Sequence, residues 1–186
     1  MRRYAFSLLF VLATFLAPHA ALADTNFASL EGFLGGTSID DAKNIVGGRD
    51  SAFSYGGALT IYGGDSDATF HWGFRVDGTF QKHSEQKDLF LVAGPQVDLE
   101  IPIANFLLIP YGFVGGGYQF KKTPGTLTIT TLNETNHTGT VAFGGGAKVP
   151  LLADFAYLHA SVFYYRGFGD SKGNNVRYVG GAGVSF

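Results

Sequence analysis

Residues 69–81 read TFHWGFRVDGTFQ, and this stretch decides the fold. Its apolar parity contains Phe70, Trp72, Phe74, Val76 and Phe80, and its polar parity contains His71, Arg75, Asp77, Thr79 and Gln81. Side chains of a strand point alternately to its two faces, whereas an amphipathic helix needs apolar residues every three or four positions. The stretch therefore predicts a strand with one aromatic face and one charged face.

The N-terminus has the three parts of a secretory signal peptide. Arginines at positions 2 and 3 precede an apolar run from Tyr4 to Ala17, and the segment ends in Ala21-Leu22-Ala23. The run is shorter than the about 20 apolar residues that a transmembrane helix needs. We therefore predict cleavage before Asp24, which gives a signal peptide (1–23) and one mature domain (24–186). An uncleaved N-terminal helix or anchor is the alternative.

The composition excludes several classes of function. Without Arg2 and Arg3, the mature chain has 11 basic residues against 15 acidic ones, so no basic surface for nucleic acid is expected. The absence of cysteine removes disulfides, thiolate metal sites and cysteine nucleophiles. We predict no cofactor and no metal site. The 27 glycines, 15% aromatic residues and only 15% charged residues favour a thin β-wall whose outer face meets an apolar phase.

Eight segments of the mature chain read as strands. They are Phe27–Ser38, Phe53–Gly63, Thr69–Gln81, Leu89–Ile101, Leu107–Lys121, Thr138–Val149, Phe155–Arg166 and Val176–Phe186. Short turns rich in Gly, Pro, Asn and Asp are expected at Gly64–Ala68, Pro102–Phe106 and Pro150–Asp154. Longer polar loops are expected at Ile39–Ala52, Lys82–Asp88, Lys122–His137 and Gly167–Asn175.

The alternation of short and long connections predicts the architecture. Together with an even number of strands, it is typical of an all-β protein that forms an eight-stranded antiparallel up-and-down transmembrane β-barrel. The short turns are then periplasmic and the longer loops extracellular. A soluble lipocalin-like barrel, with the aromatic face turned inward around a ligand, is the alternative that alternation alone leaves open.

Parity also predicts which side chains meet lipid. A basic residue near the bilayer midplane costs roughly 2–4 kcal/mol, so the charged parity of each strand is expected to face inward. For the strand at 69–81 this makes Phe70, Trp72, Phe74 and Phe80 the lipid-facing aromatic residues. The strands Leu107–Lys121 and Phe155–Arg166 are apolar on both parities, and there Gln119 and His159 indicate that odd residues face inward.

The inward-facing polar residues form a nearly balanced set of charges. The expected interior network contains Glu31, His71, Arg75, Asp77, Asp98, Glu100, Lys148 and Arg177. Eight strands enclose a space that side chains can fill, and charges there must pair because an isolated buried charge is very costly. One interpretation is a structural plug. The other is a narrow gated pore whose salt bridges rearrange.

These features resemble the small eight-stranded outer-membrane barrels of the OmpA transmembrane-domain, OmpX and opacity-protein type. The most specific likeness is the final strand Val176–Phe186, which ends in phenylalanine and carries Tyr178 and Val184 on the same parity. In that family such a strand is the signal read by the outer-membrane assembly machinery. The resemblance implies a bacterial outer-membrane location, contact with outer-membrane lipid and lipopolysaccharide, and assembly by that machinery.

The function expected of such a barrel is structural or adhesive. An envelope-integrity role, or surface attachment through the extracellular loops, fits a protein with no recognisable catalytic motif. The segment Lys122–His137 is the expected contact element for an extracellular ligand, because its threonines alternate with leucine and isoleucine and can prolong a hairpin above the membrane. An unused loop is the alternative.

An enzyme is the competing hypothesis. Some eight-stranded barrels deacylate lipid A with a His-x-Ser pair and a nearby glutamate, and His159-Ala160-Ser161 has that spacing, with the histidine activating a serine nucleophile. However, no glutamate follows His159, and parity points both side chains inward, away from lipid. We therefore expect no enzymatic activity.

Overall fold

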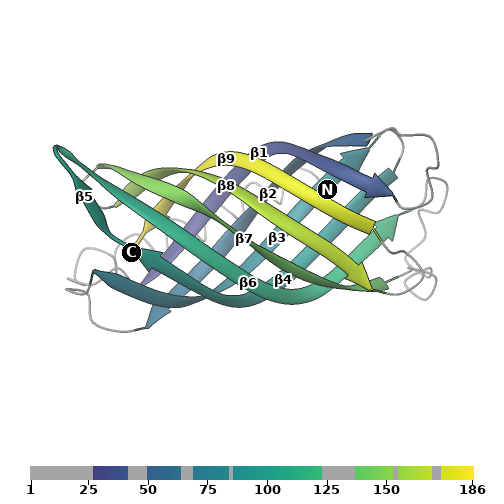
Figure 1. The fold of residues 1–186 in the computed structure, drawn as a ribbon, viewed down its shortest axis with the longest axis horizontal. Helices are drawn as coiled ribbons and strands as arrows, with labels where there is room; N and C mark the ends of the chain where they lie inside the picture. The colour runs from purple at the N-terminus through teal and green to yellow at the C-terminus, as the bar shows by residue number, and fades with distance from the viewer. Residues whose placement is uncertain are drawn as a thin grey trace, which may run out of the picture.

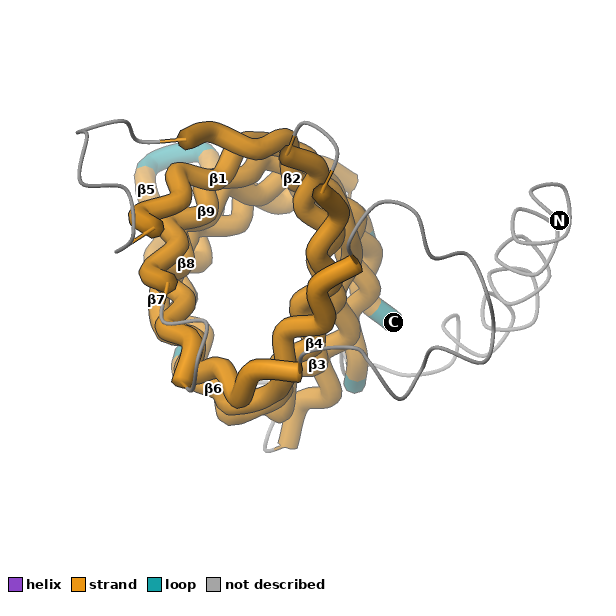
Figure 2. Tube along the Cα trace, turned by 90° about the vertical axis from the view of Figure 1, so that its right-hand side faces the viewer, coloured by secondary structure: helices purple, strands orange, loops and turns teal. Residues whose placement is uncertain are grey.

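The computed structural model describes residues 27–41, 50–63, 69–83, 86–122, 137–152, 155–168 and 173–186. These residues form one antiparallel sheet that closes into a barrel, seen from the side in Figure 1 and along its axis in Figure 2. The strands are β1 (Ala28–Asp41), β2 (Asp50–Gly63), β3 (Phe70–His83), β4 (Gln86–Leu99), β5 (Ile101–Ile103), β6 (Phe106–Lys122), β7 (His137–Leu152), β8 (Ala156–Phe168) and β9 (Gly173–Ser185). The predicted signal peptide lies outside the described residues.

The barrel closes where the first strand meets the last. β1 pairs with β2 on one side and with β9 on the other, and β4 pairs directly with β6. The backbone N–H of Ala28 donates to the carbonyl of Phe186 (2.8 Å), and the N–H of Phe186 donates to the carbonyl of Ala28 (2.9 Å). The predicted up-and-down barrel of eight long strands is thereby confirmed, with β5 as a short addition.

Several predicted connections are too long: residues 150–152 of the expected turn Pro150–Asp154 belong to β7, and two further cases are clear. β3 continues to His83 and β4 begins at Gln86, so most of the expected loop Lys82–Asp88 is paired strand. A polar sequence predicts a loop here, but the hydrogen bonds of a strand ladder join backbone groups and do not depend on side-chain polarity. The expected turn Pro102–Phe106 is also shorter, because β5 pairs with the start of β6 and the turn consists of Ala104 and Asn105.

The outer face carries large exposed apolar side chains. Trp72 is 59% exposed, and Phe70, Phe74 and Phe80 on the same strand are 46–54% exposed. Similar rows run down β2, β4, β7 and β9. No helix among the described residues is long and apolar enough to cross a membrane.

The lumen contains side chains of mixed character. Besides polar groups it holds a cluster of buried apolar and aromatic residues, which are Phe90, Val92, Tyr111, Phe113, Ala142, Phe163 and Tyr165. A smaller cluster joins Phe33, Ala58 and Val179. Gln119 and His159 are each 5% exposed, so the odd residues of β6 and β8 do face inward.

The turn at Ala104 gives a first testable prediction. Ala104 has a φ of 49°, in the left-handed region that disfavours a residue with a Cβ. We expect Ala104→Gly to stabilise the folded barrel by about 0.5–1 kcal/mol, the relief of strain less the entropy of an added glycine. Equilibrium unfolding in urea, with the protein in lipid vesicles, measures the change. Asn105→Gly is the matched control, and an equal gain from it would contradict the explanation.

Candidate functional site: an interior network of paired charges

Six of the eight predicted network residues meet inside the lumen. They are three acids and three bases, Glu31, Asp77, Asp98, Arg75, Lys148 and Arg177, each at most 4% exposed. The other two, His71 and Glu100, pair with each other through Nε2 and Oε1 at 3.2 Å, with side chains 21% and 38% exposed. The prediction that His71 and Glu100 belong to this network is therefore corrected. They form a separate contact at the end of the barrel where the chain's C-terminus lies.

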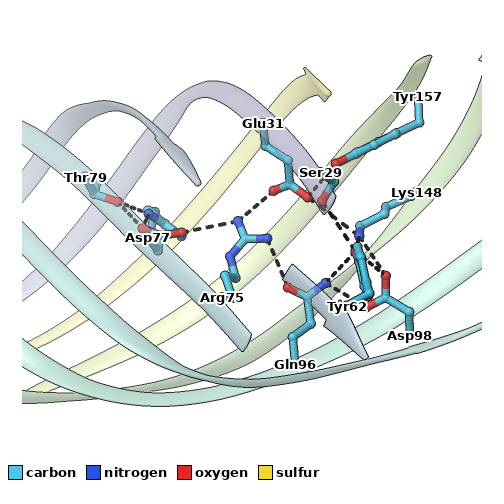
Figure 3. A network of polar contacts seen from close by, with 11 residues as sticks. Ser29, Glu31, Tyr62, Arg75, Asp77, Thr79, Gln96, Asp98, Lys148 and Tyr157 are labelled. Atoms are coloured by element: carbon cyan, nitrogen blue, oxygen red, sulfur yellow. Dashed lines mark hydrogen bonds and ion pairs between the residues drawn. The ribbon is translucent and has the colours of Figure 1, made fainter. Parts of the chain in front are cut away.

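Lys148 on β7 anchors the part of the network nearest that end. Its Nζ lies 2.7 Å from Oδ2 of Asp98 and donates to the Tyr62 hydroxyl at 2.6 Å. The Tyr62 hydroxyl donates in turn to Asp98 Oδ2 at 2.9 Å. Glu31 Oε1 lies 3.7 Å from the same ammonium. β1, β2, β4 and β7 thus meet at a single buried cation, as Figure 3 shows.

Glu31 on β1 connects this group to the middle of the lumen. Its Oε2 lies 2.7 Å from Nη2 of Arg75, and its Oε1 accepts from the Tyr157 hydroxyl at 3.0 Å. Arg75 Nη1 donates to Gln96 Oε1 at 3.1 Å, and Gln96 Nε2 donates to Asp98 Oδ1 at 2.7 Å. Gln96 therefore links the two groups with a neutral amide (Figure 3).

Asp77 and Arg177 form the most specific pair. Two parallel contacts join them, Nη1 to Oδ1 at 2.8 Å and Nη2 to Oδ2 at 2.9 Å, which is the bidentate geometry that matches a guanidinium to a carboxylate. Thr79 donates to Asp77 Oδ1 at 2.8 Å and accepts from Arg177. Arg75 Nη2 also lies 3.3 Å from Asp77 Oδ2, so Arg75 connects the middle of the network to this pair.

Aromatic rings enclose the same cations. The Arg177 guanidinium carbon lies 4.6 Å from the centroid of the Phe33 ring and 4.8 Å from that of Phe163. Lys148 Nζ lies 5.0 Å from the Tyr111 centroid and 5.3 Å from that of Tyr157. Such cation–π contacts add attraction where water is excluded. Each buried base is therefore held by a carboxylate and by ring faces together.

The neutral members of the network were not among the predicted site residues. Tyr62, Gln96 and Tyr157 all donate or accept between charged groups, yet none was predicted to belong to the site. The available signal was parity, because Tyr62 and Gln96 share the inward parity of Thr60 and Asp98. Among the described residues, no group of three or more His, Asp or Glu side chains is placed to hold a metal ion.

The His159 and Ser161 side chains point into the lumen. Both residues are 5% exposed, and neither ring nitrogen of His159 nor the Ser161 Oγ has a hydrogen-bond partner in the structure. No hydrogen bond therefore joins the two, and both side chains are on the inward parity of β8, away from the lipid-facing side. The geometry gives the pair no means of attacking an acyl ester in the membrane.

The remaining predicted residues are on the outer face or at its edge. Phe70, Trp72, Phe74, Phe80 and Tyr178 point outward, while Val184 and Phe186 are half-buried. The expected contact loop, 122–137, lies largely outside the described residues. The strands on either side of it reach Lys122 and begin at His137.

The bidentate pair gives a prediction for stability. Arg177→Met should lower the free energy of unfolding by about 3–5 kcal/mol, because it leaves the buried carboxylate of Asp77 without its main partner. Adding Asp77→Asn should recover at least about 1 kcal/mol, since no uncompensated charge then remains. Urea unfolding followed through Trp72 fluorescence measures both, with Lys82→Met on the outer face as control. Strictly additive losses would contradict the coupling.

Comparison with known proteins adds evidence about the fold. No protein-family model and no curated protein sequence matches the chain. Among solved structures, Neisserial surface protein A aligns with a TM-score of 0.59 and 11% identity over 86% of this chain and 97% of that one. The N-terminal β-barrel domain of Pseudomonas aeruginosa OprF gives 0.54 and 15% over 87% and 98%. Ail, the attachment invasion locus protein of Yersinia pestis, gives 0.50 and 12% over 86% and 96%. The fold of this chain is therefore that of the small eight-stranded outer-membrane β-barrels.

Proposed function

We propose that this protein is an integral outer-membrane barrel with an occluded lumen, which supports surface-exposed loops and contributes to envelope integrity or surface attachment. The observation that carries the proposal is the inverted distribution of polarity. Arg75, Asp77 and Arg177 are at most 1% exposed inside the barrel, while Trp72 and Phe74 are more than half exposed outside. The solved structures of similar fold, which include a surface protein and an attachment protein, support the same class of role.

The outer face supports insertion into a bilayer. Monomeric soluble proteins rarely expose apolar patches larger than a few hundred Å². Here exposed large hydrophobic residues occur on every long strand of the described barrel. A closed barrel also satisfies its backbone hydrogen bonds internally, which hydrocarbon demands. The lipocalin-like alternative requires the aromatic face inside, and Trp72 on the outer face argues against it.

The lumen supports a role other than transport. Three acids and three bases are paired within it, and aromatic rings fill the space between them. An ion crossing this region would have to separate buried pairs, each of which costs several kcal/mol to break. Recognition is therefore expected at the outer face and at the loops. The described ends of β6 and β7, at Lys122 and His137, lie opposite the end where Ala28 meets Phe186.

Trp72 allows a direct test of the membrane assignment, because it is the chain's single tryptophan. In vesicles of lipids brominated along their acyl chains, we expect strong quenching of its fluorescence. A double variant, Trp72→Phe with Phe90→Trp, moves the reporter to a position 1% exposed in the lumen and should be quenched far less. Unquenched Trp72, or a folded monomer that needs no detergent, would reject the proposal.

Electrical recording tests the occluded lumen. Purified folded protein in planar bilayers should show no steady conductance above background, because paired charges and rings fill the cross-section. A large porin recorded in the same bilayers is the positive control. Reproducible channels from the purified protein would favour the gated-pore interpretation instead.

A further inference from the structure

The outer face carries an apolar groove over β7, β8 and β9. It has a volume of about 460 Å³, and its lining includes Gly145, Ala160, Ser161, Val162, Tyr178 and Gly180. All of these residues come from neighbouring strands, and none comes from across the lumen. The groove is therefore open on the outside of the barrel.

Strand register explains why the groove forms there. Ala160 on β8 lies opposite Ala147 on β7 and Gly180 on β9, so small residues meet across three strands. Val162 and Tyr178, which are 55% and 50% exposed, stand beside this floor. Small residues also meet on the outer face of β3, where Gly78 lies opposite Gly57 on β2, but there Leu91 on β4, which is 47% exposed, stands on their other side.

A cation stands at one end of the same surface. Arg166 is exposed, shares the outward parity of Ala160, and lies opposite the exposed Asn174. Among the outward-facing side chains that the structure describes, the charged ones are Lys82 and Arg166, and none is acidic. Six residues separate Arg166 from Ala160, about 20 Å along the strand. At a tilt of about 45° this is about 14 Å along the bilayer normal, or about one leaflet of a 30 Å hydrocarbon core.

We propose that this surface binds one molecule of a phosphorylated, acylated glycolipid, the lipid A portion of lipopolysaccharide. A saturated acyl chain lies in the groove, and a phosphate pairs with the Arg166 guanidinium, with the Asn174 amide as a further donor. The inference rests on the proposed function, which places the Arg166 end of the barrel, opposite the chain's C-terminus, in the outer leaflet.

Charge complementarity favours this occupant over a second copy of the chain. A partner barrel would have to meet Arg166 with its own outer face, whose described side chains include no acidic group. A phosphoglycolipid supplies an anion for Arg166 and a hydrocarbon chain for the groove. Lys82 has the same charge at the same end of the barrel, but it lies opposite Phe53, whereas Arg166 lies opposite an amide, and an ammonium lacks the guanidinium fork that matches a phosphate, so we expect weaker retention there.

Native mass spectrometry of the folded protein, purified in detergent and titrated with lipid A, tests the inference. We expect one retained lipid A per barrel, with retention reduced about tenfold by Arg166→Gln, because a charge-assisted contact is lost. Gly180→Leu should reduce it similarly by filling the groove. A Cβ at Gly180 meets nothing closer than 3.8 Å, so the fold accommodates the change.

Matched controls lie on β3. Lys82→Gln removes the other outer cation, and Gly78→Leu adds the same side chain where a Cβ meets nothing closer than 3.9 Å. Both should retain lipid A like the unaltered protein. Equal retention by all four variants, equal retention of phosphatidylglycerol, or a lipid-free dimer would overturn the inference. If one of these results is obtained with a barrel whose Trp72 is quenched by brominated lipid, only the lipid A inference is rejected. If Trp72 is not quenched, the proposed function is rejected as well.

Discussion

Closure of the sheet is the constraint on which the rest of the structure depends. A sheet with an open edge in hydrocarbon would leave unpaired backbone N–H and C=O groups, each costing several kcal/mol. Pairing of β1 with β9, completed by the reciprocal bonds between Ala28 and Phe186, removes that edge. With eight long strands the closed wall is narrow, and its inward side chains must touch each other. Pairing of the interior charges follows from this geometry.

The network that results connects both halves of the lumen through one residue. Arg75 contacts Glu31, Gln96 and Asp77, and so joins the Lys148 group to the Asp77–Arg177 pair. Buried ion pairs often add little net stability relative to well-packed apolar residues, but breaking one is costly. The aromatic rings around Lys148 and Arg177 reduce the number of polar partners that each cation needs. The lumen therefore combines a connected set of paired charges with a packed aromatic cluster, and the proposed occlusion rests on this combination.

Much of this fold could be predicted from sequence because two solvents of opposite polarity act on the two faces of each strand. Between Phe70 and Gln81 of β3 that contrast is clear, and the orientation of Trp72 and Arg75 follows from parity alone. In β6 and β8 the lumen itself is partly apolar, so alternation weakens and the inward rings of Tyr111 and Phe163 carry no signal of their own. Strand ends were misjudged at Lys82–Asp88 because backbone pairing continues through polar residues.

Partners within the network depend on register and shear, which no local pattern encodes. Lys148 and Asp98 are 50 residues apart, and their 2.7 Å contact exists because β4, β6 and β7 pair in one particular register. The balance of inward charges could be predicted; which acid meets which base could not. The same holds outside the barrel, where Ala147, Ala160 and Gly180 read as unrelated small residues until register brings them side by side.

The proposed occlusion of the lumen implies that recognition takes place at the outer surface, and a uniform surface cannot be selective there. Any apolar outer face contacts lipid. A preference for one lipid therefore requires a local feature that combines a particular shape with a charge. The barrel has cations on two opposite walls, Lys82 on β3 and Arg166 on β8, and small residues lie beneath both, but only Arg166 has an amide, that of Asn174, opposite it. The same chain therefore provides an ammonium without an amide opposite it and a guanidinium with one. A difference in lipid retention between the two walls is attributable to the cation and its immediate surroundings, because the bilayer and the fold are held constant.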